Sequence, residues 1–461
     1  MLITELPIDI VYNILSNLDA TSLCCLNCSC KFFAQFANDE LLWKHLVFRV
    51  YNLPVTSTFR SSGWKSLYSR LSDSRVYTWG ENQDLRLGHP NPTVPIRVRG
   101  ARFAPRHISE PKELESMRGK GIVDIHAGGW SFHALDRHGR VWMWGTMAAD
   151  TGPTINIGAH RVRNPTQVAL PDDVKIKSMS CGRSHAIALA KDGSVWHWGN
   201  IWVPQRIRIN APVLQVTANW GYSTILTTEG RVYVVPVPPN VRSEDEVLHH
   251  LTVSEEDMVD LQAIENDARA SHKEIKPMQP GDRIVQVAGM EKSTLALTRF
   301  GRLFKLNTHN EAQFVLSPAA MTTELEAFGA TEPEINDPND KMHRFITAQF
   351  RNFAVYTLDG KVLLGHESDE PPQVLPQLQS DICKVSFGDY HCGALTNNGK
   401  LLTWGAYSAG ALGHGSGQPW SNKETPETVN YFSDMFVFAI GFGGWHSGAL
   451  AIPIESSESN Q

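Results

Sequence analysis

A repeated pair of strand-like segments fills most of this 461-residue chain and limits the folds that it can adopt. The first segment of each pair ends in a small residue and leucine, and the second often ends in Trp-Gly, as at residues 141–145. Because repeated units bury their apolar faces against their neighbours, the pattern predicts a stacked or circular β architecture. Seven first segments occur, at residues 122–135, 176–189, 213–226, 284–297, 345–358, 382–395 and 437–450.

Short turns that contain glycine join the two segments of a pair. Three of these turns are Asp-Gly or Asn-Gly, at residues 192–193, 359–360 and 398–399. Such dipeptides favour two-residue hairpin turns, because these turns need positive φ angles. Each pair is therefore predicted to form one antiparallel hairpin of two strands.

The two ends of the repeat region each carry half a pair. Residues 75–80 form a Trp-Gly segment with no leucine-ending segment before it, and residues 437–450 lack a Trp-Gly segment after them. Pairing these halves would complete the seventh hairpin, close a ring and remove unpaired sheet edges. We therefore expect a mainly β fold, a seven-bladed β-propeller, over residues 75–452. Its expected inserts span about 81–120, 236–283 and 306–344, and the expected flexible tail spans 453–461.

The first 47 residues have the apolar spacing of short helices instead. Pro7 and Asp9 suit a helix start, and Ile10 and Ile14 begin an apolar stripe. So small a bundle cannot bury all of its apolar side chains, so part of this surface should face a partner. A small all-α domain is expected ahead of the propeller.

Residues 48–74 are expected to connect the two domains. Trp64, Leu67 and Leu71 recur at helical spacing in this segment and predict a short amphipathic helix. Such a helix would pack the first domain against the propeller and fix their relative orientation. The two domains are nevertheless expected to have separate hydrophobic cores.

The helical segment resembles the F-box family in residue identity and spacing. The resemblance lies on Leu6, Pro7, Asp9, Ile10, Ile14, Leu15, Leu18, Leu23, Leu26, Phe33, Leu42 and Trp43. It implies that the segment binds a Skp-family adaptor, which in turn sits on a cullin. The residues expected to bind the adaptor are Leu6, Pro7, Ile10, Ile14, Leu15, Leu18, Leu23, Leu26, Phe33 and Trp43. The alternative is that some of these side chains only form the core of the bundle.

The repeats resemble those of the regulator-of-chromosome-condensation family. The resemblance lies on the Trp-Gly endings, on Leu-Gly-His at residues 87–89 and on Leu-Gly-His-Gly at residues 412–415. The units around Tyr233, Phe304 and Leu363 have lost the Trp-Gly ending, so the register of these blades rests on spacing alone.

An F-box followed by this propeller is the arrangement of the fungal SCF-associated-factor type of F-box protein. The resemblance implies the substrate-recognition subunit of an SCF (Skp/cullin/F-box) ubiquitin ligase. Such a subunit is a non-catalytic adaptor, which recruits a target protein through the propeller for ubiquitination and proteasomal degradation.

Two other functions fit parts of the sequence. The propeller's namesake is a guanine-nucleotide exchange factor for a small GTPase that also binds chromatin, but here an F-box occupies the place of its basic N-terminal tail. A structural scaffold without ligase partners would require the F-box resemblance to be accidental. Binding of the Skp-family adaptor separates all three functions.

No enzyme motif emerges from the sequence. It contains no phosphate-binding P-loop, no His-Glu-x-x-His and no nucleophile elbow, and no cofactor is expected. His133, His185, His391 and His446 are interpreted as occupying one position of successive repeats. A histidine that recurs in this way is expected to form hydrogen bonds within the blades rather than to bind a metal.

Four cysteines, Cys24, Cys25, Cys28 and Cys30, lie close together in the helical segment. The Cys-x-x-Cys spacing of Cys25 and Cys28 would suit zinc, but no second pair follows nearby to complete four ligands. We therefore expect no metal site, and we expect these thiols to be buried between helices.

Composition favours a protein partner. The net charge of -6, with 42% hydrophobic and 20% charged residues, gives no reason to expect nucleic acid or a membrane as a partner. The first residues lack the pattern of a secretory signal, and seven cysteines are an odd number that suits a reducing compartment. A cytoplasmic or nuclear location, or both, is expected.

The target itself cannot be deduced from sequence, but the inserts are candidates for binding it. The first insert is basic, and arginine suits carboxylate or phosphate recognition. An acidic or phosphorylated target segment is therefore expected to bind near Arg97, Arg99, Arg102 and Arg106. The competing explanation is that these arginines pair with the protein's own acidic insert at residues 236–283.

Overall fold

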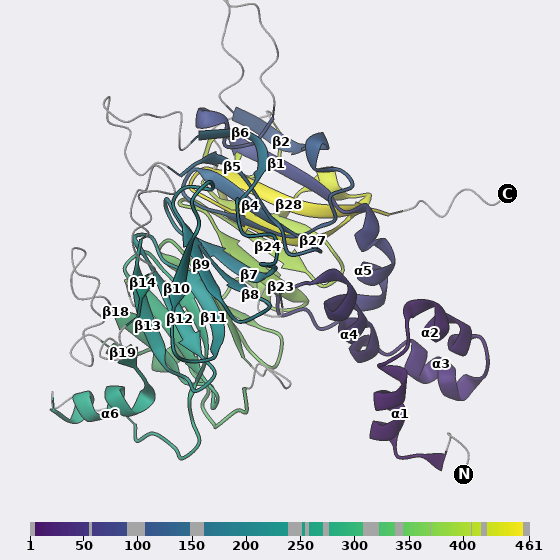
Figure 1. Ribbon diagram of the computed structural model, residues 1–461, viewed down its shortest axis with the longest axis horizontal. Coiled ribbons are helices and arrows are strands. Elements are labelled where there is room, and N and C mark those ends of the chain that lie inside the picture. The colour runs from purple at the N-terminus through teal and green to yellow at the C-terminus, as the bar shows by residue number, and fades with distance from the viewer. Residues whose placement is uncertain are drawn as a thin grey trace, which may run out of the picture.

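A helical N-terminal region precedes a ring of seven β-sheets in the computed structural model of the chain (Figure 1). This architecture confirms the predicted seven-bladed propeller with a helical domain ahead of it. The structure describes residues 5–54, 58–89, 107–147, 161–237, 251–253, 258–270, 276–307, 322–336, 344–368, 370–406, 408–415 and 422–454.

The helical region contains five short α-helices, and polar side chains cap two of them. The carboxylate of Asp19 accepts a hydrogen bond from the Ser22 amide at 2.7 Å, and Asp39 accepts one from the Leu41 amide at 2.8 Å. These caps satisfy amides that the first turn leaves without partners, which fixes where the helices begin. The helices are α1 (Ile8–Leu15), α2 (Ala20–Asn27), α3 (Lys31–Ala37), α4 (Glu40–Tyr51) and α5 (Trp64–Arg70).

The sheets are the blades of the propeller, numbered here in chain order. Blade 1 contains β3 (Ile122–Ala127), β4 (Ser131–Asp136), β5 (Val141–Thr146) and β6 (Arg161–Gln167). Blade 2 contains β7 (Ile176–Cys181), β8 (Ala186–Ala190), β9 (Val195–Trp198), β10 (Gln205–Arg208) and β14 (Leu251–Thr252). Blade 3 contains β11 (Val213–Ala218), β12 (Tyr222–Thr227), β13 (Val232–Pro236) and β15 (Met258–Val259).

The remaining sheets complete the ring. Blade 4 contains β16 (Ile284–Gly289), β17 (Ser293–Thr298), β18 (Leu303–Asn307) and β19 (Thr322–Glu324). Blade 5 contains β20 (Phe345–Gln349), β21 (Asn352–Tyr356) and β22 (Val362–His366). Blade 6 contains β23 (Ile382–Phe387), β24 (His391–Thr396), β25 (Leu401–Gly405) and β26 (Lys423–Thr428).

The last blade joins the two ends of the propeller. Blade 7 contains β27 (Met435–Phe442), β28 (His446–Pro453), β1 (Arg75–Glu81) and β2 (His107–Glu113). Strands β1 and β28 are antiparallel, with Val76 opposite Leu450 and Thr78 opposite Gly448. The predicted closure is therefore confirmed, because each end of the chain supplies two adjacent strands of one sheet.

The strand content of each repeat differs from the prediction. Each leucine-ending segment was expected to be one strand, but it contains two, such as β3 and β4 with the sequence Gly128-Gly129-Trp130 between them. The chain reverses there because Gly128 donates its amide to the carbonyl of Ser131 at 2.8 Å. A repeat therefore supplies three strands. Where a blade has more than three strands, later segments supply the additional ones, and β2, β14, β15 and β19 lie within the intervals expected to be inserts.

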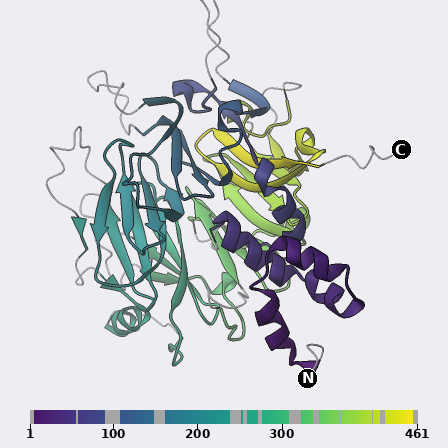
Figure 2. The same ribbon diagram turned by 45° about the vertical axis from the view of Figure 1, so that its right-hand side comes forward.

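Helices α4 and α5 pack against the propeller, whereas α1, α2 and α3 extend away from it (Figures 1 and 2). One continuous apolar cluster runs from Val11 and Trp43 through Trp64 and Leu71 to Ile122 in blade 1. The expectation of separate cores is therefore wrong. The reason is that the amphipathic helix α5 buries its apolar face between both domains, with Trp64 2% exposed.

The segment between α4 and α5 crosses one end of the ring. Asn52 donates a side-chain hydrogen bond to the carbonyl of Ile176 in blade 2 at 3.0 Å, and the Phe59 amide donates to the carbonyl of Cys383 in blade 6 at 2.8 Å. The ring of Phe59 also stacks on Phe345 of blade 5, with a centroid distance of 5.9 Å. Contacts to three different blades hold the helical domain in one orientation.

Candidate functional site

Helix α1 exposes large apolar side chains to solvent. Ile8 is 60% exposed, Ile10 is 44% exposed and Ile14 is 41% exposed, whereas Val11 and Leu15 of the same helix are buried. Figure 1 shows α1 beside the N-terminus, in the part of the helical domain that extends away from the propeller. Exposed apolar side chains that gather on one short helix, away from the body of the molecule, form a surface suited to a protein partner.

The structure places the residues expected to bind the adaptor at three depths. Pro7, Ile10 and Ile14 are exposed, and Leu6, Leu18, Leu26 and Phe33 are half-buried. Leu15, Leu23 and Trp43 lie in the core, where the Trp43 indole donates a hydrogen bond to the carbonyl of Ala37 at 2.8 Å. Sequence reasoning missed Ile8, although its place in the first helical turn, next to Pro7, indicates exposure.

The cysteine cluster differs from the expectation. Cys24, Cys25, Cys28 and Cys30 are all exposed, not buried between helices. The reason is that α2 buries Leu23 and half-buries Leu26, so the neighbouring cysteines point away from the bundle. Within the described residues, no group of three or more His, Cys, Asp or Glu side chains could hold a metal ion.

The recurrent histidines connect neighbouring blades. His185 Nε2 lies 2.9 Å from Ser223 Oγ of blade 3, and His391 Nε2 lies 2.8 Å from Ser447 Oγ of blade 7. His446 Nε2 lies 3.3 Å from the carbonyl oxygen of Ser131 in blade 1. These contacts support the structural interpretation of the histidines, but the hydrogen bonds join different blades rather than lying within one.

The four histidines were interpreted as sharing one position of the repeat, but His133 occupies a different position from the other three. His391 and His446 stand opposite the glycines of Trp-Gly segments, whereas His133 stands opposite Met143, and Ser131 takes the position opposite Gly145. Its contact is also different, because the Trp198 indole of blade 2 donates a hydrogen bond to His133 Nε2 at 3.2 Å. The shift arises because a strand alternates its faces, so a residue two positions further along points to the same side.

Burial keeps these imidazoles neutral. Desolvation lowers the pKa of His133 and His391 to about 3 and that of His185 to about 4, and it lowers the pKa of His446 well below its usual value. The physical cause is that the charged ring would lose its hydration in the blade interior. Neutral imidazoles that bridge blades are suited to structure, not to acid or base chemistry near neutral pH.

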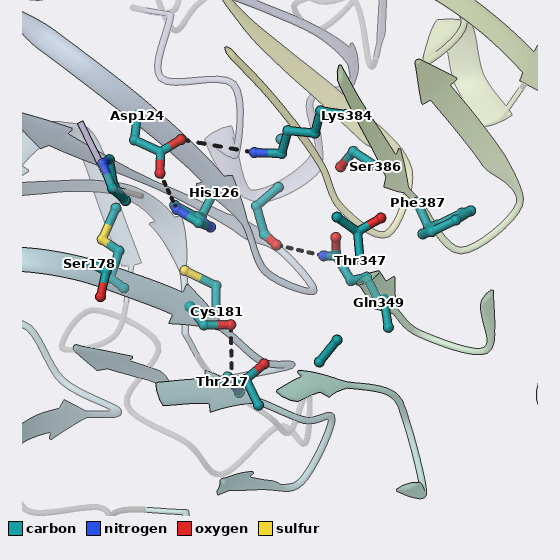
Figure 3. A pocket seen from close by; sticks show the side chains of 18 of the residues that line it. Asp124, His126, Ser178, Cys181, Thr217, Thr347, Gln349, Lys384, Ser386 and Phe387 are labelled. Carbon is teal, nitrogen blue, oxygen red and sulfur yellow. Dashed lines mark hydrogen bonds and ion pairs between the residues drawn. The ribbon is translucent and has the colours of Figure 1, made fainter. Parts of the chain in front are cut away.

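A cavity of about 140 Å³ lies at the centre of the ring, lined by the innermost strand of every blade. Figure 3 shows Asp124 of β3 facing His126 and Lys384, at 2.9 Å and 4.0 Å. Burial raises the pKa of the Asp124 carboxyl, but the charges of His126 and Lys384 outweigh this effect, so its pKa lies below the usual value. The carboxylate is thus held ionised and paired.

Two bonds of the cavity wall cross the ring. Lys384 belongs to β23 and Asp124 to β3, which are not adjacent inner strands. Gln349, the last residue of β20, donates a hydrogen bond to the carbonyl of Ala127, the last residue of β3, at 2.8 Å. Pro54 of the connecting segment lines the same cavity. An ion pair and a hydrogen bond therefore connect non-adjacent blades across the cavity.

The loops at the other end of the ring carry an aromatic surface that sequence reasoning missed. Tyr390 and Trp445 are exposed, Trp130 and Trp220 are half-buried, and Phe350 is buried against Trp220. Together these five side chains are called the aromatic mouth here. Three of them could have been found from the repeat, because Trp130, Tyr390 and Trp445 each stand five residues before the leucine that ends the repeat's first segment.

The basic insert proposed as a target site is described only in part. Arg97, Arg99, Arg102 and Arg106 lie outside the described residues. Other basic residues of the interval are engaged: Arg86 pairs with Glu81 at 2.9 Å, and Lys120 lies over the Trp142 ring at 4.4 Å from its centroid. These two cations of the interval therefore already have partners within the protein.

Comparison with known families identifies the two parts of the molecule. Residues 3–49 match the F-box-like family. Residues 73–135 and 398–450 match the regulator of chromosome condensation (RCC1) repeat, and residues 176–200 and 382–409 match a second model of that repeat. The chain therefore combines an F-box-like domain with a propeller of RCC1 repeats. The matches fall mainly on the blades that keep the Trp-Gly ending, as the sequence pattern indicates.

Individual relatives are similar at low identity. Protein pim1 of Schizosaccharomyces pombe is 21% identical over 406 residues, which cover 84% of this chain and 66% of that protein. The E3 ubiquitin-protein ligase HERC2 of Mus musculus is 25% identical over 406 residues, which cover 84% of this chain but 7% of that protein. The chain thus spans less than two thirds of the length of either relative.

Solved structures share the propeller fold. Human WBSCR16 superposes with a TM-score of 0.56 at 20% identity, over 82% of this chain and 99% of that one. Prp20p from Saccharomyces cerevisiae superposes with a TM-score of 0.56 at 16% identity, over 87% of this chain and 97% of that one. At these identities the likeness concerns the fold alone. Among the described helices, none is long and apolar enough to cross a membrane.

Proposed function

We propose that this chain is the substrate-recognition subunit of an SCF ubiquitin ligase, of the fungal SCF-associated-factor type. Its F-box-like domain binds a Skp-family adaptor, which sits on a cullin, and its propeller holds a protein target for ubiquitination and degradation. The observation that carries the proposal is the exposed apolar surface of α1 within a segment that matches the F-box-like family.

The geometry of α1 suits adaptor binding. Ile10 and Ile14 are four residues apart and lie on one helix face, so an apolar groove can take both side chains together. Full burial of an isoleucine side chain contributes roughly 1.5–3 kcal/mol, so two such residues supply a substantial part of a binding free energy. Leu15, Leu23 and Trp43 would act through the core, by holding α1 at its angle to α2 and α4.

The connection between the domains suits the positioning of a target. The amide of Trp64 donates to the Glu40 carboxylate at 2.8 Å, which joins α5 to α4, and Asn52 and Phe59 bond to two blades. A target held by the propeller would therefore keep a fixed orientation relative to an adaptor held by α1. Conjugation chemistry would remain with other subunits of the ligase.

Co-purification of a Skp-family adaptor with the full chain tests this proposal. The double variant Ile10→Glu/Ile14→Glu is expected to weaken adaptor binding at least about 100-fold, because two buried apolar contacts become charged. Both side chains are solvent-exposed in the free protein, so the melting temperature should remain that of the parent chain. The matched control is Val374→Glu, which places a charge at an exposed apolar residue of the propeller.

Undiminished adaptor capture by the double variant would reject α1 as the docking surface. Failure of the unmodified chain to capture any Skp-family adaptor would reject the ligase function. In that case release of nucleotide from a small GTPase should be measured, because Prp20p, whose propeller fold this chain shares, binds Gsp1p and histones. The anion-binding role of Arg97, Arg99, Arg102 and Arg106 stays a proposal that depends on the ligase function.

A further inference from the structure

The aromatic mouth lies at the end of the propeller opposite the helical domain. The inner strands begin at the connecting segment, as the bonds to Ile176 at the start of β7 and to Cys383 in β23 show. They end at the loops that carry the aromatic mouth, which follow β3, β11, β20, β23 and β27. The cross-ring bond from Gln349 to Ala127 lies directly below this end. A partner would therefore lie across the mouth rather than thread through the ring.

Hydrogen bonds between neighbouring loops hold the mouth in one conformation. The Gly129 amide donates to the carbonyl of Arg183 at 3.1 Å, and the Arg183 amide donates to the carbonyl of Trp220 at 3.2 Å. On the other side of the ring, the Asp389 amide donates to the carbonyl of Gly444 at 3.1 Å. A surface whose backbone is already ordered loses little conformational entropy on binding, which favours affinity.

The side chains of the mouth have the composition of a protein-binding surface. Tyr390 is 52% exposed and Trp445 is 42% exposed, and their rings lie 6.4 Å apart. Trp220 packs on Phe350 with a centroid distance of 5.3 Å. Tyr and Trp are enriched where binding energy concentrates, because they bury a large area with few rotatable bonds.

The guanidinium of Arg183 packs beside two of these aromatic rings. Its guanidinium lies 5.0 Å from the Trp130 ring and 5.1 Å from the Trp220 ring. Its Nε is buried without a hydrogen-bond acceptor, and no carboxylate among the described residues forms an ion pair with it. Contact with both indoles restricts the guanidinium, and its terminal N–H groups form the fork that a carboxylate can meet.

Arg351, on the other side of Trp220, has carboxylate partners that balance its charge. Arg351 lies 3.8 Å from the carboxylate of Glu291 and 3.6 Å from that of Asp389. These three residues line a hollow of about 560 Å³ together with Lys292, His366, Glu367 and Ser368 and with the aromatic side chains of Trp220, Phe350 and Tyr390. Trp220 thus contacts Arg183 and also lines a hollow whose other side chains are mainly charged or polar.

We propose that the aromatic mouth binds an extended segment of the target protein, with an Asp or Glu carboxylate on Arg183 and an apolar side chain on the exposed rings of Tyr390 and Trp445. This inference rests on the proposed function and names the target segment that the propeller recognises. A carboxylate suits the site because Arg183 offers one planar fork, whereas phosphorylated segments are usually read by clusters of arginines. The surface therefore assigns recognition to an unmodified acidic sequence next to an aromatic or aliphatic residue.

Selection of peptides from a random displayed library against the full chain in its adaptor complex tests the inference. The selected peptides are expected to contain Asp or Glu beside a large apolar residue. Arg183→Gln should weaken binding of a selected synthetic peptide about 10- to 100-fold, because a charge-assisted bidentate contact is lost. The control Arg231→Gln removes a cation that pairs with Glu229 away from the mouth, and it should leave peptide affinity unchanged.

A charge exchange separates recognition from a merely structural role. Arg183→Glu should abolish binding of the acidic peptide and restore binding of the same peptide with its acid replaced by lysine. Selected peptides without acidic residues, or full affinity in Arg183→Gln, would overturn the inference. Stronger binding of a phosphoserine peptide would overturn the choice of a carboxylate. Loss of affinity on charge reversal of Arg97, Arg99, Arg102 and Arg106, with Arg183→Gln unaffected, would move the anion site to the insert.

The two proposals fail in different measurements. Peptide affinity reports on the mouth, whereas capture of the Skp-family adaptor by the same variants reports on α1. Arg183→Gln is expected to retain adaptor capture, because it lies on the side of the ring away from the helical domain. If the chain binds acidic peptides but no adaptor, the proposal for the aromatic mouth stands and the proposed ligase function is rejected.

Discussion

Two parts of the propeller solve the same packing problem with different residues. A buried histidine makes the contact at four boundaries, which are called the histidine junctions here. They lie between blades 7 and 1, 1 and 2, 2 and 3, and 6 and 7. The residues are His446, His133, His185 and His391. The other three boundaries, between blades 3 and 4, 4 and 5, and 5 and 6, use side chains that do not titrate near neutral pH and are called the uncharged junctions.

The uncharged junctions are as fully bonded as the histidine junctions. Asn219 of blade 3 donates to the carbonyls of Met290 and Ser293 of blade 4 at 3.1 Å and 2.8 Å. Gln286 of blade 4 forms a two-way pair with the backbone of Ile346 in blade 5, at 2.9 Å and 3.0 Å. The phenol of Tyr356 in blade 5 accepts a hydrogen bond from the Val385 amide of blade 6.

Each of these uncharged junctions joins a blade that lacks the Trp-Gly ending to the blade that follows it. These blades lack the Trp-Gly ending of the repeat, but the buried polar groups at their boundaries still need hydrogen-bond partners. The difference teaches that the repeat motif is one solution to joining adjacent blades, and that amides and a phenol replace it. It also predicts that acid affects the two groups of junctions differently.

The largest expected effect comes from opening the ring. Deletion of residues 436–461 removes β28 and nearly all of β27, so β1 loses its partner strand and the buried side chains of Val76 and Trp79 become exposed. We expect loss of cooperative unfolding or aggregation, measured by calorimetry and light scattering. Deletion of residues 455–461 alone is the control, since it removes no described strand. A soluble monomer with unchanged melting would show that closure is not needed for stability.

Acidification should be the next largest perturbation, and it should be local. A histidine with a folded pKa near 3 or 4 and an unfolded pKa near 6.5 binds its proton only after unfolding, so stability is full above pH 6.5 and falls as pH decreases toward the folded value. By pH 5 each such group costs about 2 kcal/mol. Hydrogen exchange corrected for intrinsic rates should show faster opening of β4, β24 and β28 than of β17 and β21.

Between pH 7.5 and 8.5 the same measurement should show no loss at either group of junctions, because these imidazoles are already neutral. Equal acid sensitivity of β17, in blade 4, and β28, in blade 7, would contradict the distinction between histidine and uncharged junctions.

The smallest of these effects concerns one uncharged junction. Asn219→Ala removes an amide that bonds to blade 4 and also accepts a hydrogen bond from Thr224 at 3.0 Å. Several buried groups are left without partners, so we expect a loss of about 2–4 kcal/mol in the free energy of unfolding, measured by urea denaturation. Gln262→Ala is the matched control, since its amide bonds to Asn266 on the exposed face of α6 (Leu261–Ala270). A loss no larger than that of the control would contradict the importance of this junction.

The amino-acid sequence by itself determined the propeller, its closure and the helical domain. Alternating strands, Asp-Gly and Asn-Gly turns and the half pairs at each end are local signals, and each constrains the backbone within a few residues. The Trp79 ring illustrates this, because its indole donates to the carbonyl of Ala411 at 2.7 Å and Gly413 of the Leu-Gly-His-Gly motif packs on the same ring.

Only the tertiary structure decided which side chains are free to bind. Val11 and Ile10 are adjacent apolar residues, yet one is buried and the other exposed, because α1 turns one face toward its bundle. The core shared through α5 and the packing of Arg183 against Trp130 and Trp220 also depend on segments far apart in the chain. Periodicity shows which residues share a face of a strand or helix, whereas the neighbour that covers or frees that face is set by packing across the ring.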